Sequence, residues 1–292
     1  MYDRENDKRT SYLILWTYAI LMACILFLIG SCASKESTNT IVQTPDIVKP
    51  QSEPTPEIPV PVPDPEPLVI KIGYSKFPYP PLHYINESKD LVGFDPALAK
   101  AAAGIMGAEI EFIPINWSQR ADLLESGEVD ALWGGLERAS LDERVVKFTK
   151  AYLRSNIVLL MEADRNYAKF EDLQGQNVCA LNFTPAFDYL QAYNRDVIKS
   201  RRSFTPPDYH ELLTALTSGE FDCMITDTSF AAFYQKATGE TFKMSESLMG
   251  SSYAVAVRIG DTDLFDLLQA ALDELEAGGE VTRLADTWIN NP

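Results

Sequence analysis

The sequence predicts an α/β fold with two lobes of similar build, and two observations support this prediction. Strand-like and helix-like segments alternate from residue 68 to residue 290, which is typical of mostly parallel sheets with helices on their faces. The order helix, Ser-Gly-Glu, apolar residue, Asp and buried strand occurs twice, in LLESGEVDALWGG and in LLTALTSGEFDCMITD. Ligands of open parallel sheets bind beyond the carboxyl ends of the strands, so two facing lobes would enclose one cleft.

The first copy of this pattern is predicted to run β-α-β-α-β. LVIKIGYS at 68–75 is rich in β-forming residues and is expected to form a strand. GFDPALAKAAAGIMG contains a helix, with Asp95 at the N-cap, Pro96 at the first helical position and Gly107 after the end. AEIEFIPIN alternates as a strand does, SQRADLLESGE forms a short helix that ends at Gly127, and VDALWGG is a second buried strand.

The second copy is predicted to follow a similar order. FEDLQGQNVCALN ends in a strand, PAFDYLQAY forms a helix, and DYHELLTALTSGE forms another helix, which ends at Gly219. FDCMITD is a strand, TSFAAFYQKA a helix and SSYAVAVRI a strand. The last segment, TDLFDLLQAALDELEAGGEVTRLADTWIN, is predicted to form two helices that are separated at Gly278-Gly279, because glycine favours helix ends.

Residues 1–31 are expected to form a signal peptide. SYLILWTYAILMACILFLIG is almost continuously apolar, Lys8 and Arg9 precede it, and small residues follow it. The sequence IGSC, which ends at Cys32, resembles the lipobox of bacterial lipoproteins, and this resemblance implies cleavage before Cys32 and lipid attachment to its thiol. A retained transmembrane anchor is the alternative, since about 20 apolar residues span a bilayer. Either reading tethers the rest of the chain to the membrane outside the cytoplasm.

Residues 32–67 are expected to be a lipid-attached, proline-rich linker. Proline recurs every two to five residues in TPDIVKPQSEPTPEIPVPVPDPEP, and apolar side chains are scarce. Such a segment cannot build a core and favours an extended stalk that rises about 3 Å per residue. We therefore expect this linker to hold the folded part away from the membrane surface.

Charge and residue types exclude several classes of function. The net charge of −17 argues against nucleic acid as a partner, because phosphate binding requires a surplus of Lys and Arg. The two histidines, His83 and His210, are distant in sequence and nothing has metal-ligand spacing, so we expect no metal and no cofactor. Cys179 and Cys223 stand in strand-like runs, either as buried thiols, which we favour, or as one disulfide. No residue set for catalysis is evident, so we expect a binding protein and not an enzyme.

Several segments resemble, in their order and spacing, the family-3 extracellular solute-binding proteins of bacteria, the polar-amino-acid receptors of ABC transporters. The resemblance covers about residues 69–290, and it implies a type II periplasmic-binding-protein fold, in which two α/β lobes are joined by two crossing strands and close over a ligand by a hinge motion. The segments that carry it are YPPLHY, LVGFDPALAKA, INW, LLESGEVDALWGG, VVKFTKAYL, FEDLQGQNV, ALTSGEFDCMITD, YAVAV and ADTWIN. The implied lobes are residues 69–151 plus 254–292 for lobe 1 and 157–248 for lobe 2, with the crossings near 152–156 and 249–253.

The resemblance also implies roles for residues at matching positions. Tyr79 and Trp117 stand where the family has aromatic residues that flank the ligand, and core packing is the alternative for both. Asp227, at the end of DCMITD, matches the acid that binds the α-ammonium group of the ligand, and a helix N-cap is the alternative. Thr184 remains as a candidate ligand contact in NFTPAF, where Pro185 lacks the N–H that the family pattern donates.

The carboxylate half of the family site is altered in this chain. The family pattern Gly-x-Thr/Ser-x-Thr-x-x-Arg, aligned on Gly135, places Glu137 at the hydroxyl position and Asp142 at the position of the carboxylate-binding arginine. Arg138 or Arg144 would restore the missing cation, or the site has changed its preference toward an amine or quaternary ammonium ligand. Solvation at the rim is the alternative for the two acids. The loop that carries this pattern, including Gly134-Gly135, is expected to line the ligand site.

We therefore expect a membrane-tethered, monomeric solute-binding protein of an ABC importer. Its ligand would be an amino acid or a related small nitrogenous solute, bound in a cleft between the lobes and delivered to an ABC permease. A sensory or interaction protein that kept the fold but lost the amino-acid site is an alternative. An enzyme that resembles cyclohexadienyl dehydratase is a further one, which the replacement of arginine by an acid disfavours.

Overall fold

The structure is a computed structural model, and it describes residues 67–192, 200–204, 217–239 and 242–290. The predicted signal peptide or anchor at 1–31, the lipid-attachment site Cys32 and nearly all of the linker at 32–67 lie outside these residues. So does most of the predicted helix before Gly219. In the part of the chain that is described, every helix is too short or too polar to cross a bilayer.

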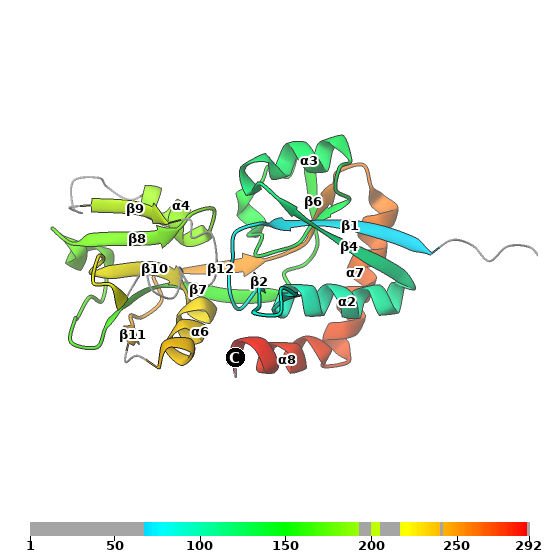
Figure 1. The fold of residues 1–292 in the computed structure, drawn as a ribbon. Helices are drawn as coiled ribbons and strands as arrows, with labels where there is room; N and C mark the ends of the chain where they lie inside the picture. The colour runs from blue at the N-terminus through cyan, green and yellow to red at the C-terminus, as the bar shows by residue number, and fades with distance from the viewer. Residues whose placement is uncertain (1–66, 193–199, 205–216, 240–241, 291–292) are drawn as a thin grey trace, which may run out of the picture. The chain divides into compact units, whose positions relative to one another are not determined.

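The first sheet has five strands in the order β4-β1-β5-β13-β6. Strand β1 is parallel to both β4 and β5, whereas β13 is antiparallel to β5 and β6. Helix α3 lies on one side of this sheet and helices α2 and α8 on the other (Figure 1). The strands are β1 (Leu68–Ser75), β4 (Ala108–Ile115), β5 (Ala131–Leu132), β6 (Val146–Phe148) and β13 (Ala256–Arg258), and the helices are α2 (Phe94–Met106), α3 (Arg120–Ser126), α7 (Thr262–Ala277) and α8 (Glu280–Ala285).

The second sheet has the order β11-β7-β10-β8-β9, and β12 also pairs with β7. Strand β8 is parallel to β9 and β10, while β7 is antiparallel to β10, β11 and β12. The strands are β7 (Leu153–Glu162), β8 (Asn177–Leu181), β9 (Ser200–Phe204), β10 (Cys223–Asp227), β11 (Phe242–Met244) and β12 (Met249–Tyr253), and the helices are α4 (Pro185–Ala192) and α6 (Thr228–Thr238).

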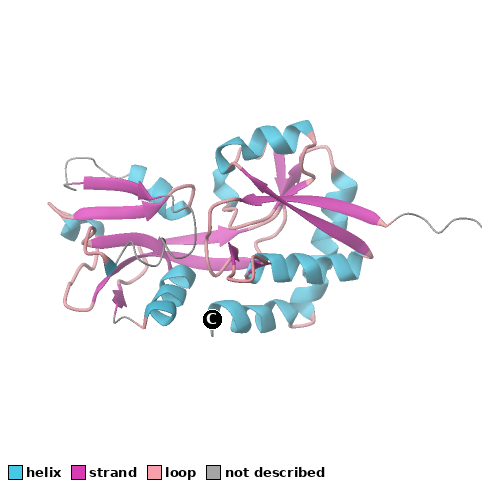
Figure 2. Cartoon of the chain, in the orientation of Figure 1, coloured by secondary structure: helices cyan, strands magenta, loops and turns pink. Residues whose placement is uncertain are grey.

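Two strands connect the two sheets. Strand β7 leaves the first sheet after β6, and β12 returns to it before β13 (Figures 1 and 2). The two pair antiparallel with each other, from Met249 opposite Ile157 to Tyr253 opposite Leu153. This arrangement gives two α/β lobes joined by two crossing strands, as predicted; the lobe bounds at 69–151 plus 254–292 and 157–248 stay a prediction.

Shorter elements connect the main ones and include the loops of the site. Strands β2 (Tyr84–Ile85) and β3 (Leu91–Val92) form a separate antiparallel pair. Helical turns of 3-10 type occur at η1 (Trp117–Gln119), η2 (Arg138–Ser140) and η3 (Phe170–Leu173), and η4 (Asp286–Asn290) is a π-helical end after α8. Turn η1 directly precedes α3, and η2 follows the loop after β5.

Helix α2 corrects one predicted helix start. The N-cap is Gly93, and Asp95 makes no capping bond to its own helix. Gly93 has φ +125°, and an added Cβ would lie 2.5 Å from the Leu82 oxygen, so this position requires glycine. The Asp95 carboxylate instead accepts a bond of 2.6 Å from the Gly135 N–H. Asp95 therefore binds a residue that is distant in sequence, and not the start of its own helix as the sequence predicted. The predicted helix end at Gly107 is confirmed.

Apolar side chains are continuous from the first lobe into the second. One cluster packs Phe94 and Leu98 of α2 against the first sheet and also includes Leu160 and Phe230 of the second lobe. All four are at most 1% exposed, and burial of such side chains contributes roughly 1.5–3 kcal/mol each. Tyr79 belongs to the same cluster, so the boundary between the lobes is a packed interior around the site.

Cys179 and Cys223 are free, buried thiols, as we favoured. In the register of β8 with β10, Cys179 lies opposite Met224 and Cys223 lies opposite Val178. Adjacent positions of a strand point to opposite faces of the sheet, so the two thiols belong to different apolar clusters. The disulfide alternative is therefore wrong for this arrangement of strands.

Candidate functional site

A glycine turn after β5 forms one wall of the site. Gly135 has φ +63°, and an added Cβ would lie 2.6 Å from Cδ1 of Tyr79, so only glycine fits beside this ring. Its N–H is held by the buried carboxylate of Asp95. Burial raises the pKa of Asp95 to about 7, and the Gly135 bond opposes this shift only in part. Gly134 is also tightly packed, with the Tyr74 Cβ 3.0 Å from an added Cβ.

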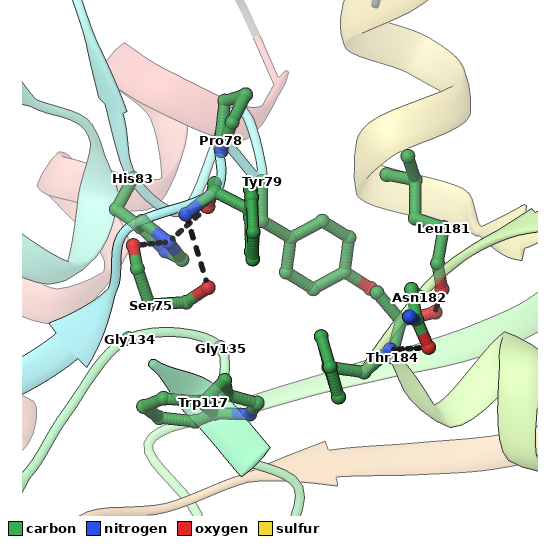
Figure 3. Close-up of a pocket in the computed structure, with 12 residues that line it drawn as sticks. Ser75, Pro78, Tyr79, His83, Trp117, Gly134, Gly135, Leu181, Asn182 and Thr184 are labelled. Atoms are coloured by element: carbon green, nitrogen blue, oxygen red, sulfur yellow. Dashed lines mark hydrogen bonds between the residues drawn. The ribbon is translucent and has the colours of Figure 1, made fainter. Parts of the chain in front are cut away.

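Two cavities lie between this wall and the second lobe. The smaller, of about 20 Å³, holds roughly one water molecule. The larger measures about 190 Å³. Both are lined by Trp117, Gly135, Asn182, Phe183 and Thr184, and Figure 3 shows how Trp117 of the first lobe and Asn182 and Thr184 of the second surround the smaller one. The smaller is also lined by Ser75, Phe77, Pro78, Tyr79, His83, Gly134 and Leu181, and the larger by Arg120, Glu137, Ser140, Pro185, Phe187 and Asp188.

The larger cavity, which we call the interlobe cavity, brings together three charged side chains. Arg120 begins α3 and Glu137 precedes η2, both in the first lobe, whereas Asp188 lies on α4 of the second. Burial raises the pKa of Glu137, and the nearby Asp188 raises it further. Partial burial also raises the pKa of Asp188, and Arg120 counteracts this effect.

Arg120 is a site residue that sequence reasoning missed. Its Nη1 donates to the Trp117 carbonyl at 2.8 Å and its Nη2 to the Ser140 carbonyl at 3.0 Å, and the guanidinium lies 5.5 Å from the Trp117 ring centre. Burial lowers its pKa, and Asp188 raises it in part. A sequence signal existed, because a cation in the first turn of a helix opposes the helix dipole and needs another reason to be there.

A second group of polar residues joins the lobes beside these cavities. Asp227 is fully buried and is the N-cap of α6, where its Oδ1 accepts from the N–H groups of Ser229 at 2.9 Å and Phe230 at 3.0 Å. Its Oδ2 accepts from the hydroxyl of Tyr79, which belongs to the other lobe, and weakly from that of Tyr253 at 3.4 Å. Asp227 therefore serves as the helix N-cap that we considered as an alternative, and it lines neither cavity.

The two tyrosines of this group remain protonated donors. Their hydroxyl oxygens lie 2.9 Å apart. Burial, together with the neighbouring Asp227, raises the pKa of Tyr79 and Tyr253 well above the ordinary value. Tyr79 thus faces the smaller cavity with its ring while its hydroxyl binds across the lobes. Whether Asp227 contacts a ligand stays a prediction.

Of the remaining predicted residues, Thr184 lines both cavities, whereas Arg138 and Arg144 line neither. Thr184 caps α4, because its hydroxyl accepts from the Phe187 N–H at 3.3 Å and donates to the Leu181 carbonyl at 2.7 Å. The Arg144 side chain is 88% exposed and pairs with Asp142, away from both cavities. Arg138 is also outside them and pairs with Glu143 at 3.6 Å. The structure thus brings neither predicted arginine to the interlobe cavity.

His83 is a buried residue of the smaller cavity for which the sequence predicted no role. Its Nε2 lies 3.1 Å from the carbonyl oxygens of both Ser75 and Phe77. Burial lowers the pKa of His83 to about 4, so the ring is neutral near pH 7. Among the described residues, no group of three His, Cys, Asp or Glu side chains is placed to hold a metal ion.

Comparison with known proteins identifies the family. Residues 70–291 match the bacterial extracellular solute-binding proteins, family 3. This chain belongs to that family. The solved structures that it resembles include an ancestral arginine-binding protein bound to arginine, with a TM-score of 0.67 and 25% identity over 75% of this chain and 97% of the other. The predicted type II periplasmic-binding-protein fold is thereby confirmed.

Two curated relatives and a further structure show the range of similarity. The chain is 26% identical to ABC transporter arginine-binding protein 1 of Escherichia coli (strain K12), over 72% of this chain and 87% of the relative. It is 24% identical to the arginine-binding extracellular protein ArtP of Bacillus subtilis (strain 168), over 94% and 97%. An ancestral amino acid-binding protein described as a precursor of cyclohexadienyl dehydratase shares the fold, with a TM-score of 0.66 and 23% identity over 76% of this chain and 95% of the other.

Proposed function

We propose that this protein is the solute-binding component of an ABC importer and binds an amino acid or a related small nitrogenous solute between its lobes. The interlobe cavity carries the proposal, because both lobes contribute to it and it combines charged groups with the Trp117 ring. Among the predicted ligand contacts, Trp117, Gly135, Glu137 and Thr184 line this cavity. Relatives that are named for arginine binding support an amino acid as the ligand class.

A thermal-shift and calorimetric screen of the full-length protein in detergent tests this function. A ligand at a hundred times its Kd stabilises the folded state by about 2.7 kcal/mol, which raises the melting temperature by several degrees. We expect one or a few amino acids to give such a rise. Glu137→Gln should reduce it, whereas Glu274→Gln, on an exposed position of α7, should leave it unchanged. No rise with any amino acid or amine would refute the proposal.

The envelope location belongs to the same proposal. Lipid on Cys32 anchors the protein, the linker spaces the lobes from the membrane, and one copy of the chain serves a permease there. Incorporation of a labelled fatty acid tests the anchor: Cys32→Ser should abolish it and release the chain from the membrane. A Cys32→Ser protein that stays in the membrane fraction would instead favour the uncleaved helix.

An interaction or sensory protein without a transported solute is a second candidate. The Tyr79–Asp227 bond favours it, since the acid that matches the family's ammonium-binding position already has a partner from the opposite lobe. A screen in which every small molecule is silent would support this candidate. Catalysis is not part of either proposal, and turnover of prephenate or arogenate by the purified chain would contradict both.

A further inference from the structure

We propose that the ligand is a cationic amino acid, whose carboxylate is held by Arg120 and whose positive groups face Glu137 and Asp188. This inference rests on the proposed function and names the substrate class of the same site. It reassigns the carboxylate contact from the predicted Arg138 and Arg144 to an arginine on a different element, at the start of α3.

Arg120 has N–H donors that no protein group accepts. A guanidinium carries five N–H groups, and two of its nitrogens are held by the carbonyls of Trp117 and Ser140. Its Nε is buried and has no hydrogen-bond partner. In the described part of the chain no carboxylate forms an ion pair with Arg120. The two carbonyls and the Trp117 ring therefore orient a guanidinium that lies near Asp188 without an ion pair to it and keeps donors for a ligand.

In this chain, the family position of the carboxylate-binding arginine provides no cation to the site. Asp142 stands there, and it is occupied by the exposed side chain of Arg144. Among the described residues that line the interlobe cavity, Arg120 is the sole cation. A planar guanidinium matches the two oxygens of a carboxylate, so Arg120 can make the same kind of contact from another element.

The interlobe cavity contains more acidic than basic side chains. Glu137 and Asp188 face it from opposite lobes, and the proximity of Asp188 hinders ionisation of Glu137. When both carboxylates are ionised, they and the one guanidinium sum to −1, which a ligand of net charge +1 neutralises. A cationic amino acid has this charge and also supplies the carboxylate for Arg120. An amine without a carboxylate would leave Arg120 unpaired, and an acidic amino acid would meet the two acids.

Isothermal titration of the full-length protein with matched ligands tests these contacts. L-arginine and L-lysine each contain the carboxylate, agmatine and cadaverine lack it, and L-citrulline is a neutral analogue of arginine. We expect L-arginine or L-lysine to bind at least ten-fold more tightly than its decarboxylated amine. We also expect L-arginine to bind at least ten-fold more tightly than L-citrulline.

Variants separate the roles of the three side chains. Arg120→Gln should weaken the cationic amino acid about ten- to a hundred-fold, while the affinity for its amine changes far less. Glu137→Gln and Asp188→Asn should reduce the preference for L-arginine over L-citrulline. Arg283→Gln, which removes an exposed guanidinium paired with Glu280 on α8, is the matched control and should bind as the parent protein does.

Three outcomes would overturn the inference, and only one of these would also refute the proposed function. If a neutral or acidic amino acid binds and Arg120→Gln has no effect, the protein is still a solute-binding protein but the assignment of Arg120 is wrong. The assignment is also wrong if Arg144→Gln causes the loss instead. If no amino acid binds, both proposals fail. Circular dichroism of Arg120→Gln shows that a loss of affinity is not a loss of fold.

Discussion

Replacement of Asp95 by asparagine should change how stability depends on pH. The Asp95 side chain is 1% exposed, and one of its oxygens accepts from Gly135. Burial raises its pKa from 3.8 to about 7. Between these values the folded protein retains a proton that the unfolded chain has released, so the free energy of unfolding falls as pH rises.

The size of this effect follows from the two pKa values. The loss is about 1.4 kcal/mol per pH unit and about 4 kcal/mol over the whole window, and it is complete above pH 7. Asparagine cannot ionise, yet its amide oxygen can still accept from Gly135. If burying the amide costs a fixed amount, the free energy of unfolding of Asp95→Asn is lowered equally at every pH. The difference between the two proteins in how this free energy changes with pH is then unaffected.

Urea unfolding of the full-length protein at a series of pH values from 4 to 8 measures this difference. The free energy of unfolding of Asp95→Asn minus that of the parent protein should increase between pH 4 and 7 and then become constant. Asp90→Asn, at an exposed position, is the control for the substitution itself. Parallel curves for Asp95→Asn and the parent would show that burial does not hold a proton on this carboxyl group.

Three further predictions address packing. Gly135→Ala should destabilise the fold more than Gly107→Ala does. Both positions have φ near +63°, so an alanine costs about 1–3 kcal/mol of backbone strain at either, but only at Gly135 does the added Cβ also clash with Tyr79. Equal losses of unfolding free energy in urea would contradict this clash. Tyr79→Phe should cost about 1–3 kcal/mol, since it removes a buried donor to a carboxylate, and an unchanged unfolding midpoint would show that the bond contributes nothing. Cys179 and Cys223 should react with a thiol reagent only after unfolding, because burial removes access and raises the pKa of both, and peptide mapping of rapid native labelling would disprove their burial.

Local sequence signals predicted most of the fold. Glycines after apolar periodic segments marked the ends of α2 and α3, at Gly107 and Gly127. The break at Gly278-Gly279 likewise separates α7 from α8. These features depend on a few neighbouring residues, which is why the sequence alone suffices for them.

Contacts between distant residues escaped prediction. Tyr79 and Asp227 are 148 positions apart, and only the tertiary structure shows that the phenol reaches the carboxylate. The sequence predicts Arg120 only as part of a short helix, because its contact with the Ser140 carbonyl depends on how two loops approach each other. The motif predicts a replacement cation nearby, at Arg138 or Arg144, whereas the interlobe cavity receives its cation from another element.

The pairing of β7 with β12 limits the directions in which the lobes can rotate. Their hydrogen-bonded register makes the connection a ribbon and not two independent linkers. A two-stranded ribbon flexes readily out of its own plane, but bending within that plane would stretch one strand and break bonds between the two. Any opening of the lobes would therefore be a rotation about an axis that runs across the ribbon, and bending within the plane of the ribbon would be opposed.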